Sequence, residues 1–157
     1  MAFYQLIKEQ DIPASANQVW DFIATPRNLK RITPDEMGFK IITDYVPEKM
    51  YEGMKVGYEV FPFRGIKSKW LTEITFIQEG KYFVDEQRIG PYRLWHHQHI
   101  LEEISEGTRM RDVITYAIPF GVLGSLMNKL IIRKKLEDIF EYRRKAMEKE
   151  FGKIKKS

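Results

Sequence analysis

The stretch IKSKWLTEITFIQEGKYFVDEQRIGPYRLWHHQHILEEISEGTRMRDVITYAI (residues 66–118) decides the fold class of this 157-residue chain. Polar and apolar residues alternate along it with a period of two, which is typical of strands that have one buried face. Glu79-Gly80 and Glu106-Gly107 stand where tight hairpin turns are expected. Strands joined by such short turns pair antiparallel. The stretch therefore predicts four antiparallel strands, at residues 66–78, 81–89, 94–104 and 108–118.

The same signal extends toward the N-terminus. Three further runs have the pattern of strands, at residues 2–12, 39–46 and 54–63. After the first of them, Ser15-x-x-Gln18 is a capping-box pattern that predicts the start of a helix. Thr25-Pro26 predicts a second helix, with Thr25 as its cap and Pro26 in its first turn. That second helix must be short, because Pro34 follows.

The C-terminal segment, residues 120–150, has a helical period instead. Its apolar residues recur at i, i+3 and i+4, and they are Leu123, Leu126, Met127, Leu130, Ile131, Leu136, Ile139, Phe140 and Met147. We therefore expect an α+β fold, in which a seven-stranded antiparallel sheet curves around one long C-terminal helix, with two short helices after the first strand. Such a sheet is wider than one helix, so its centre can stay hollow. The domain is expected to span residues 1–152, with a basic tail at 153–157.

Composition and charge argue against several functional classes. Cysteine is absent, which excludes a disulfide framework, a thiolate zinc site and a cysteine nucleophile. The net charge is +4, but glutamates interleave the C-terminal basic residues, which favours a solvated helix face over a specific anionic partner. These basic residues are Arg143, Arg144, Lys145, Lys149, Lys153, Lys155 and Lys156. The N-terminus lacks a signal-peptide pattern, and the longest apolar run, residues 117–127, is too short to span a bilayer. We expect a cytoplasmic protein that binds no nucleic acid and does not insert stably into membranes, and the oligomeric state stays open.

Specific strings in the chain resemble a known superfamily. The string FVDEQRIGPYRLWHHQH (residues 83–99) is similar to a bacterial, ligand-binding branch of the START, birch-pollen-allergen and polyketide-cyclase superfamily. The strings at residues 12–15, 19–23 and 107–112 and the pattern Tyr116-x-x-Pro119 agree with it, so the resemblance covers nearly the whole chain. It implies a helix-grip fold, with a cavity between the sheet and the C-terminal helix that holds a small hydrophobic or amphipathic molecule. For this branch it implies no particular ligand and no particular reaction.

Strand alternation predicts which side chains face such a cavity. Residues two apart share a face, and charged residues such as Arg109 and Arg111 mark the face that needs water. The inward set combines aromatic rings with polar groups. Its candidate ligand-binding residues are Trp70, Thr72, Phe83, Asp85, Gln87, Trp95, His97, His99, Asp112 and Tyr116, and the helix stripe adds Leu123 and Met127.

The polar members of this set allow two interpretations, because buried polar groups must be paired. In the first, Asp–His and Gln–Tyr pairs satisfy one another and form a polar patch in the core. In the second, they converge on the polar head of a ligand, whose apolar body rests on Trp70, Phe83 and Trp95. So many polar residues on one inner face favour the second interpretation, in which the protein stores, transports or senses a small molecule.

The histidines and aspartates also raise the question of chemistry. His97-x-His99 with Asp85 or Asp112 supplies ligand types for zinc or iron, but the spacing along a strand favours a hydrogen-bonded histidine pair. No metal and no other cofactor is therefore expected. Asp–His pairs can act as general acid and base, and the superfamily includes cyclases and hydratases. Because no serine or cysteine nucleophile is placed beside these pairs, we assign no catalytic residue. A cyclase or dehydratase acting on a polyketide or aromatic molecule is the alternative function.

The connection between the last strand and the long helix, PFGVLGS at residues 119–125, contains two glycines. Each weakens a helix by about 1 kcal/mol relative to alanine, so this end of the helix is expected to open more readily than its middle. Phe120, Val122 and Leu123 could then form the lip of a cavity mouth. The same side chains could instead pack as ordinary core, or contact another surface such as a membrane.

Overall fold

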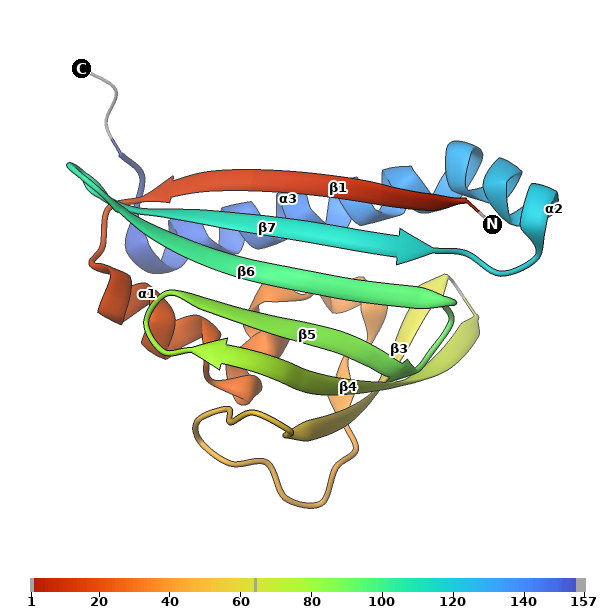
Figure 1. Cartoon of the computed structure of the whole chain (residues 1–157), viewed down its shortest axis with the longest axis horizontal. Coiled ribbons are helices and arrows are strands. Elements are labelled where there is room, and N and C mark those ends of the chain that lie inside the picture. The colour runs from red at the N-terminus through yellow and green to blue at the C-terminus, as the bar shows by residue number, and fades with distance from the viewer. Residues whose placement is uncertain (1, 64, 155–157) are drawn as a thin grey trace.

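The structure is a computed structural model that describes residues 2–63 and 65–154 (Figure 1). Residues 155–157 of the predicted basic tail lie outside the described residues. The elements in chain order are β1 (Phe3–Ile12), α1 (Ala16–Ile23), the 3₁₀ helices η1 (Pro26–Ile32) and η2 (Asp35–Met37), β2 (Lys40–Ile41), β3 (Lys55–Phe63), β4 (Ile66–Gln78), β5 (Tyr82–Ile89), β6 (Leu94–Ile104), β7 (Gly107–Ala117), α2 (Gly121–Met127), the π-helical segment η3 (Asn128–Ile132) and α3 (Arg133–Phe151).

The seven strands form one sheet in the order β1-β7-β6-β5-β4-β3-β2. Every neighbouring pair is antiparallel. The strand nearest the N-terminus joins the last one, with Phe3 opposite Ala117 and Ile12 opposite Thr108. The C-terminal helix runs lengthwise behind β1 and β7 in Figure 1, on the inner side of the curved sheet. The predicted α+β fold is confirmed, with its seven antiparallel strands and one long C-terminal helix.

The N-terminal helix begins as its capping box predicts. The hydroxyl of Ser15 accepts a hydrogen bond from the amide of Gln18, and the Gln18 side chain accepts one from the amide of Ser15. The second helical segment is the 3₁₀ helix η1, with Pro26 in its first turn. Thr25 does not cap it, because its hydroxyl donates to the carbonyl of Asp21 instead, at 2.7 Å.

The strand predicted at residues 39–46 is much shorter in the structure, where β2 comprises two residues. The Thr43 side chain accounts for its early end. The Thr43 hydroxyl accepts a hydrogen bond from the amide of Gly57 at 2.6 Å, so the side chain occupies the donor that a longer ladder would use. Pro47 follows shortly after. Regular pairing with β3 therefore stops at Ile41.

The C-terminal helix turns a different face toward the sheet from the one that its apolar stripe predicts. Gly124 and Asn128 are buried at its start, and Ile132 and Leu136 continue this face at intervals of four. The stripe residues of this first part are instead exposed, namely Leu123, Leu126, Met127, Leu130 and Ile131. Two features explain why this part of the helix is rotated about its axis. Gly124 packs so closely on the backbone that an added Cβ would lie 2.0 Å from the carbonyl oxygen of Pro119, and Asn128 accepts a hydrogen bond from Tyr116.

The core has two main parts. One packs α1 and Met147 against β4, β5 and β6, and it includes the edge-to-face pair of Trp20 and Phe83, with ring centroids 5.8 Å apart. The other surrounds Tyr116, with Ile114 and Leu136 among its buried members. Across residues 2–63 and 65–154, we find no helix that combines the length and the apolar character needed to cross a membrane.

Candidate functional site

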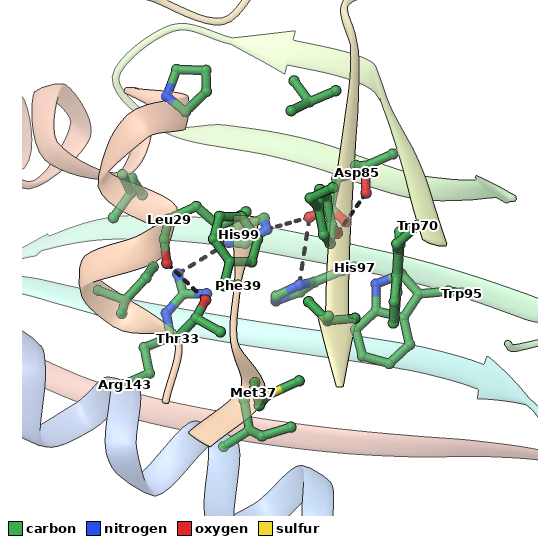
Figure 2. A pocket seen from close by; sticks show the side chains of 18 of the residues that line it. Leu29, Thr33, Met37, Phe39, Trp70, Asp85, Trp95, His97, His99 and Arg143 are labelled. Atoms are coloured by element: carbon green, nitrogen blue, oxygen red, sulfur yellow. Dashed lines mark hydrogen bonds and ion pairs between the residues drawn. The ribbon is translucent and has the colours of Figure 1, made fainter. Parts of the chain in front are cut away.

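A cavity of about 260 Å³ lies between the inner face of the sheet, the 3₁₀ helices and α3. Its floor consists of side chains from the middle strands, and its other walls come from η1, η2 and α3. Figure 2 shows Leu29 and Thr33 at the left of the view, Met37 near its bottom, and Arg143 reaching in from the helix. The curvature of the sheet thus leaves a space that a single helix does not fill.

One end of the cavity is lined by aromatic rings. Trp70 stacks on Tyr58 at a centroid distance of 5.9 Å and meets Trp95 edge-on at 5.2 Å. Tyr92 completes the group, 4.9 Å from Trp95. Together these rings present a polarisable wall of faces and edges, which suits an apolar body that contains rings or double bonds.

The other end is a buried polar cluster on three adjacent strands. His97 and His99 project from the same face of β6, because they are two residues apart. Asp85 lies opposite His97 on β5, and Asp112 lies opposite His99 on β7. The histidines are therefore flanked by one carboxylate on each side. Figure 2 shows His97, His99 and Asp85 pointing toward one another.

The hydrogen bonds in this cluster run diagonally across the strands. His99 Nε2 donates to Asp85 Oδ2 at 2.6 Å, and His97 Nε2 donates to Asp112 Oδ1 at 2.9 Å. The two imidazole rings lie 3.8 Å apart, and Phe83 stacks on the outer side of His99 at 3.9 Å. The Asp–His pairing expected from strand alternation is present in the structure.

Arg143 belongs to the same cluster, which corrects its assignment to a solvated helix face. It is 7% exposed, and its Nη2 donates to His99 Nδ1 at 3.3 Å and lies 3.5 Å from Asp112 Oδ1. A sequence signal for its burial existed: residue 143 continues the spacing of Leu136, Phe140 and Met147, the buried face of α3. Its charge concealed this position, because a lone arginine in a basic helix usually points to solvent.

The burial and the charges shift the pKa values of these groups. Burial alone raises the pKa of Asp112, but Arg143 and the two histidines outweigh it and hold that pKa well below its usual range. Burial also raises the pKa of Asp85, and the histidines again outweigh it, so that this pKa is lowered. Burial and the neighbouring His99 lower the pKa of His97, although both carboxylates oppose this change. The two aspartates are therefore charged at neutral pH.

Seven of the candidate residues line the cavity, and five do not. The lining members are Trp70, Thr72, Phe83, Asp85, Trp95, His97 and His99. The side-chain amide of Gln87 donates to the carbonyl of Tyr92 and accepts from its amide N–H. The Tyr116 hydroxyl donates to Asn128 Oδ1 at 2.9 Å, and Asp112 lies behind the histidines. Leu123 and Met127 are on the exposed side of the helix, and the described segment 119–131 contributes no lining side chain.

Sequence reasoning missed the walls that η1 and η2 supply. Leu29, Thr33 and Met37 line the cavity from these short helices and the residue after η1. They lie in a segment where the apolar residues are irregularly spaced, so no period marks an inner face. The weak available signal was the pair Leu29 and Ile32, three residues apart after Pro26.

Two buried donors at the cavity lack partners among the described residues. They are Nε of Arg143 and Nε1 of Trp70, and both residues line the cavity. Thr72 differs, because its hydroxyl is hydrogen-bonded to the hydroxyl of Tyr58 at 2.8 Å. An unsatisfied buried donor costs about 1–3 kcal/mol, so an acceptor that reached either nitrogen would be stabilising.

Comparison with solved structures finds the same fold in bacterial and allergen proteins. TTHA0849 from Thermus thermophilus aligns with a TM-score of 0.68 and 19% identity, over 94% of this chain and 95% of that one. CV1439 from Chromobacterium violaceum aligns with a TM-score of 0.71 and 12% identity, over 95% of this chain and 98% of that one. Ara h 8.0201, a homologue of the birch-pollen allergen, aligns with a TM-score of 0.62 and 15% identity, over 93% of this chain and 98% of that one. The chain has a helix-grip fold. No family model matches it, and neither does any curated protein.

Proposed function

We propose that the protein binds a small amphipathic molecule in the cavity, with oxygen acceptors of that molecule at Arg143, in the polar cluster, and at Trp70, at the aromatic end. The observation that carries this proposal is the presence of two unpartnered buried donors on side chains that line an apolar cavity. Both are N–H groups, so the complementary ligand atom is a carboxylate, carbonyl or phenolate oxygen. The volume of about 260 Å³ is slightly below the range for small-molecule sites, which begins at about 300 Å³.

The aromatic wall supplies the apolar half of this recognition. Trp70, Tyr92 and Trp95 line the same space as the donors, so a ligand can rest its rings there while its oxygen reaches Arg143. Storage, transport and sensing all need such a site, and the binding step is common to the three. Helix-grip proteins such as Ara h 8.0201 share the fold alone with this chain.

Native mass spectrometry of the freshly purified protein tests the proposal first, because it reports a retained molecule directly. A fluorescent probe, 1-anilinonaphthalene-8-sulfonate, tests it quantitatively. Val56→Phe places extra volume in the cavity wall and should weaken probe binding at least tenfold. Val122→Phe is the matched control, because Val122 is 88% exposed on α2. The proposal fails if the wild-type protein binds neither a co-purified molecule nor the probe, or if Val122→Phe removes binding as Val56→Phe does.

Acid–base chemistry on the bound molecule is the second candidate function. It is favoured by the hydrogen bond of 2.6 Å between His99 and Asp85, both of which line the cavity. Such a pair can transfer a proton to or from a ligand carbon or oxygen, as a cyclase or dehydratase requires. Incubation with candidate polyketide and aromatic compounds should then yield products. Asp85→Asn should lower turnover on the order of 100-fold or more, whereas recovery of every compound unchanged would exclude those reactions.

A further inference from the structure

The two histidines of the polar cluster each direct one ring nitrogen toward Asp85 and the other toward Asp112. On the Asp85 side, His99 Nε2 lies 2.6 Å and His97 Nδ1 lies 3.5 Å from the same oxygen, Oδ2. On the Asp112 side, His97 Nε2 lies 2.9 Å and His99 Nδ1 lies 3.2 Å from Oδ1. The imidazoles thus form two parallel bridges between a carboxylate at the cavity and a carboxylate behind it.

The imidazole nitrogens that face Asp85 carry too few hydrogens to satisfy its carboxylate. A neutral imidazole carries one N–H. When the single hydrogen of a neutral His97 is on Nε2, Asp112 Oδ1 accepts it at 2.9 Å. Its Nδ1 therefore turns a lone pair toward a carboxylate oxygen only 3.5 Å away. Two electron-rich atoms facing each other in a buried site repel unless a proton or a metal cation lies between them.

The charges of the whole cluster point the same way. Two carboxylates, Asp85 and Asp112, face a single guanidinium, that of Arg143. The guanidinium balances only one of the two carboxylates, and all five side chains are largely buried. Buried charges in proteins are paired or coordinate metals.

We propose that Asp85 Oδ2, His97 Nδ1 and His99 Nε2 bind a divalent first-row transition-metal ion such as Zn²⁺ or Fe²⁺. These three residues offer ligand atoms that all lie within 4.8 Å of one another. Metal–ligand bonds of about 2.1 Å place adjacent ligand atoms about 3.0–3.4 Å apart. Binding therefore requires Asp85 to move away from His99, 2.6 Å from it now, and the two stacked imidazoles to splay so that both lone pairs point at the ion. Two imidazoles and one carboxylate are a donor set that suits both ions.

Asp112 is the positioning residue of this site. Histidines that bind metals usually donate their second ring N–H to a carboxylate, which fixes the tautomer and the ring orientation. His97 already makes this contact. When His99 Nε2 binds the ion, the hydrogen of His99 moves to Nδ1, and Asp112 Oδ1 is 3.2 Å away to accept it. Arg143 then loses its hydrogen bond to His99 Nδ1 and keeps its ion pair with Asp112.

The ligand atoms are arranged so that an ion remains accessible. Asp85, His97 and His99 all line the cavity, whereas Asp112 lies behind them. Three protein ligands leave coordination positions open, as in catalytic rather than structural metal sites. An oxygen of a bound molecule can occupy one of them. This extension rests on the proposed function, but the proposal of the metal site does not.

Equilibrium dialysis of the full chain, with any affinity tag removed, tests the proposal with Zn²⁺ and with Co²⁺ as a spectroscopic probe. We expect one ion per chain. Asp85→Asn and His97→Gln should each weaken binding on the order of 100-fold, and Asp112→Asn by about 10–100-fold. His96→Gln is the matched control, because His96 lies on the same strand but on the opposite face, beside Glu86. It should leave the affinity unchanged.

The tautomer of His99 provides a readout on the wild-type protein that does not depend on any variant folding. Imidazole ¹⁵N NMR should show the hydrogen of His99 on Nε2 without metal and on Nδ1 with Zn²⁺, while His97 keeps its hydrogen on Nε2. The proposal is overturned if the wild-type protein binds no ion, if His96→Gln abolishes binding, or if His99 retains its hydrogen on Nε2 in the presence of bound Zn²⁺. Probe binding in the cavity is measured separately, so either proposal can fail alone.

Discussion

The two halves of the C-terminal helix differ in which residues they bury. In α3 the face toward the sheet contains Leu136, Phe140, Arg143 and Met147, so it buries a charge among apolar side chains. In α2 and η3 the face toward the sheet contains Gly124 and Asn128, while large apolar residues remain in solvent. The more hydrophobic half is therefore the less buried one.

This difference shows that specific contacts, rather than hydrophobicity, orient the helix. At its start, the close approach of Gly124 to Pro119 and the hydrogen bond from Tyr116 to Asn128 set its rotation. Farther along, Arg143 is held by His99 and Asp112 on the sheet. The helix is continuous, so the contacts of one half constrain the other.

We expect the largest loss of stability when the buried charge of Arg143 is removed. Arg143→Met leaves Asp112 buried without its guanidinium, which should reduce the free energy of unfolding by about 3–5 kcal/mol, measured by urea denaturation. Arg144→Met is the matched control. Arg144 pairs with Glu141 and Glu148 on the surface, so its loss should cost a small fraction of that amount.

A double variant separates charge pairing from lost packing. Arg143→Met with Asp112→Asn should lose less stability than the sum of the two single changes, because the neutral amide no longer needs the guanidinium. Additive losses, or equal effects of Arg143→Met and Arg144→Met, would contradict the role assigned to Arg143.

The next test compares one leucine from each half. Leu136→Ala should destabilise the protein by about 2–5 kcal/mol, because it leaves a cavity in the core, and Leu136 is only 3% exposed. Leu130→Ala should change stability by less than about 0.5 kcal/mol, because Leu130 is exposed. Thermal or urea unfolding of both variants measures the difference. A similar loss in both would show that the first half is packed in solution.

Gly124→Ala tests the contact that rotates the helix. In an ordinary helix this change stabilises, by about 1 kcal/mol. Here the new methyl group would lie 2.0 Å from the carbonyl of Pro119, so we expect destabilisation of about 1–3 kcal/mol instead. The sign of the change in unfolding free energy decides the matter, and a stabilised variant would contradict the close approach.

The smallest expected effect concerns local opening of the first half of the C-terminal helix rather than the stability of the whole protein. Amides of residues 119–126 should exchange hydrogen faster than those of 133–147, because few buried side chains hold the first half. Mass-detected hydrogen exchange, with and without the fluorescent probe, measures this. If the segment gates the cavity, the probe will slow its exchange. Equal protection in both segments, with no effect of the probe, would reject the gate.

Much of the polar cluster could be predicted from strand alternation alone. Asp85, His97, His99 and Asp112 fall on one face because the period of two holds wherever a strand is regular. Their partners could be inferred too, since neighbouring strands bring them together. The fold class followed from the same regularity, with β4 and β6 matching their predicted bounds.

The remaining parts of the site depend on contacts that no local period encodes. Arg143 is buried because His99 and Asp112 on the sheet pair with it, and its own sequence neighbours are mostly charged. Leu123 and Met127 have the helical spacing of core residues, but the burial of Gly124 turns them outward. Leu29 lies in a 3₁₀ turn, whose spacing gives no clear apolar face.

The pairing of the first strand with the last also determines the order of events during synthesis. Phe3 faces Ala117 and Ile12 faces Thr108, so β1 leaves the ribosome about a hundred residues before its partner. At about 5–20 residues per second, that interval lasts roughly 5–20 s. During it, β1 exposes both edges, which can pair with other nascent chains. The middle hairpins can form as they emerge, whereas the first strand must wait. Completion of the sheet is therefore a late step, and the time that β1 spends unpaired is the interval in which a chaperone would matter most.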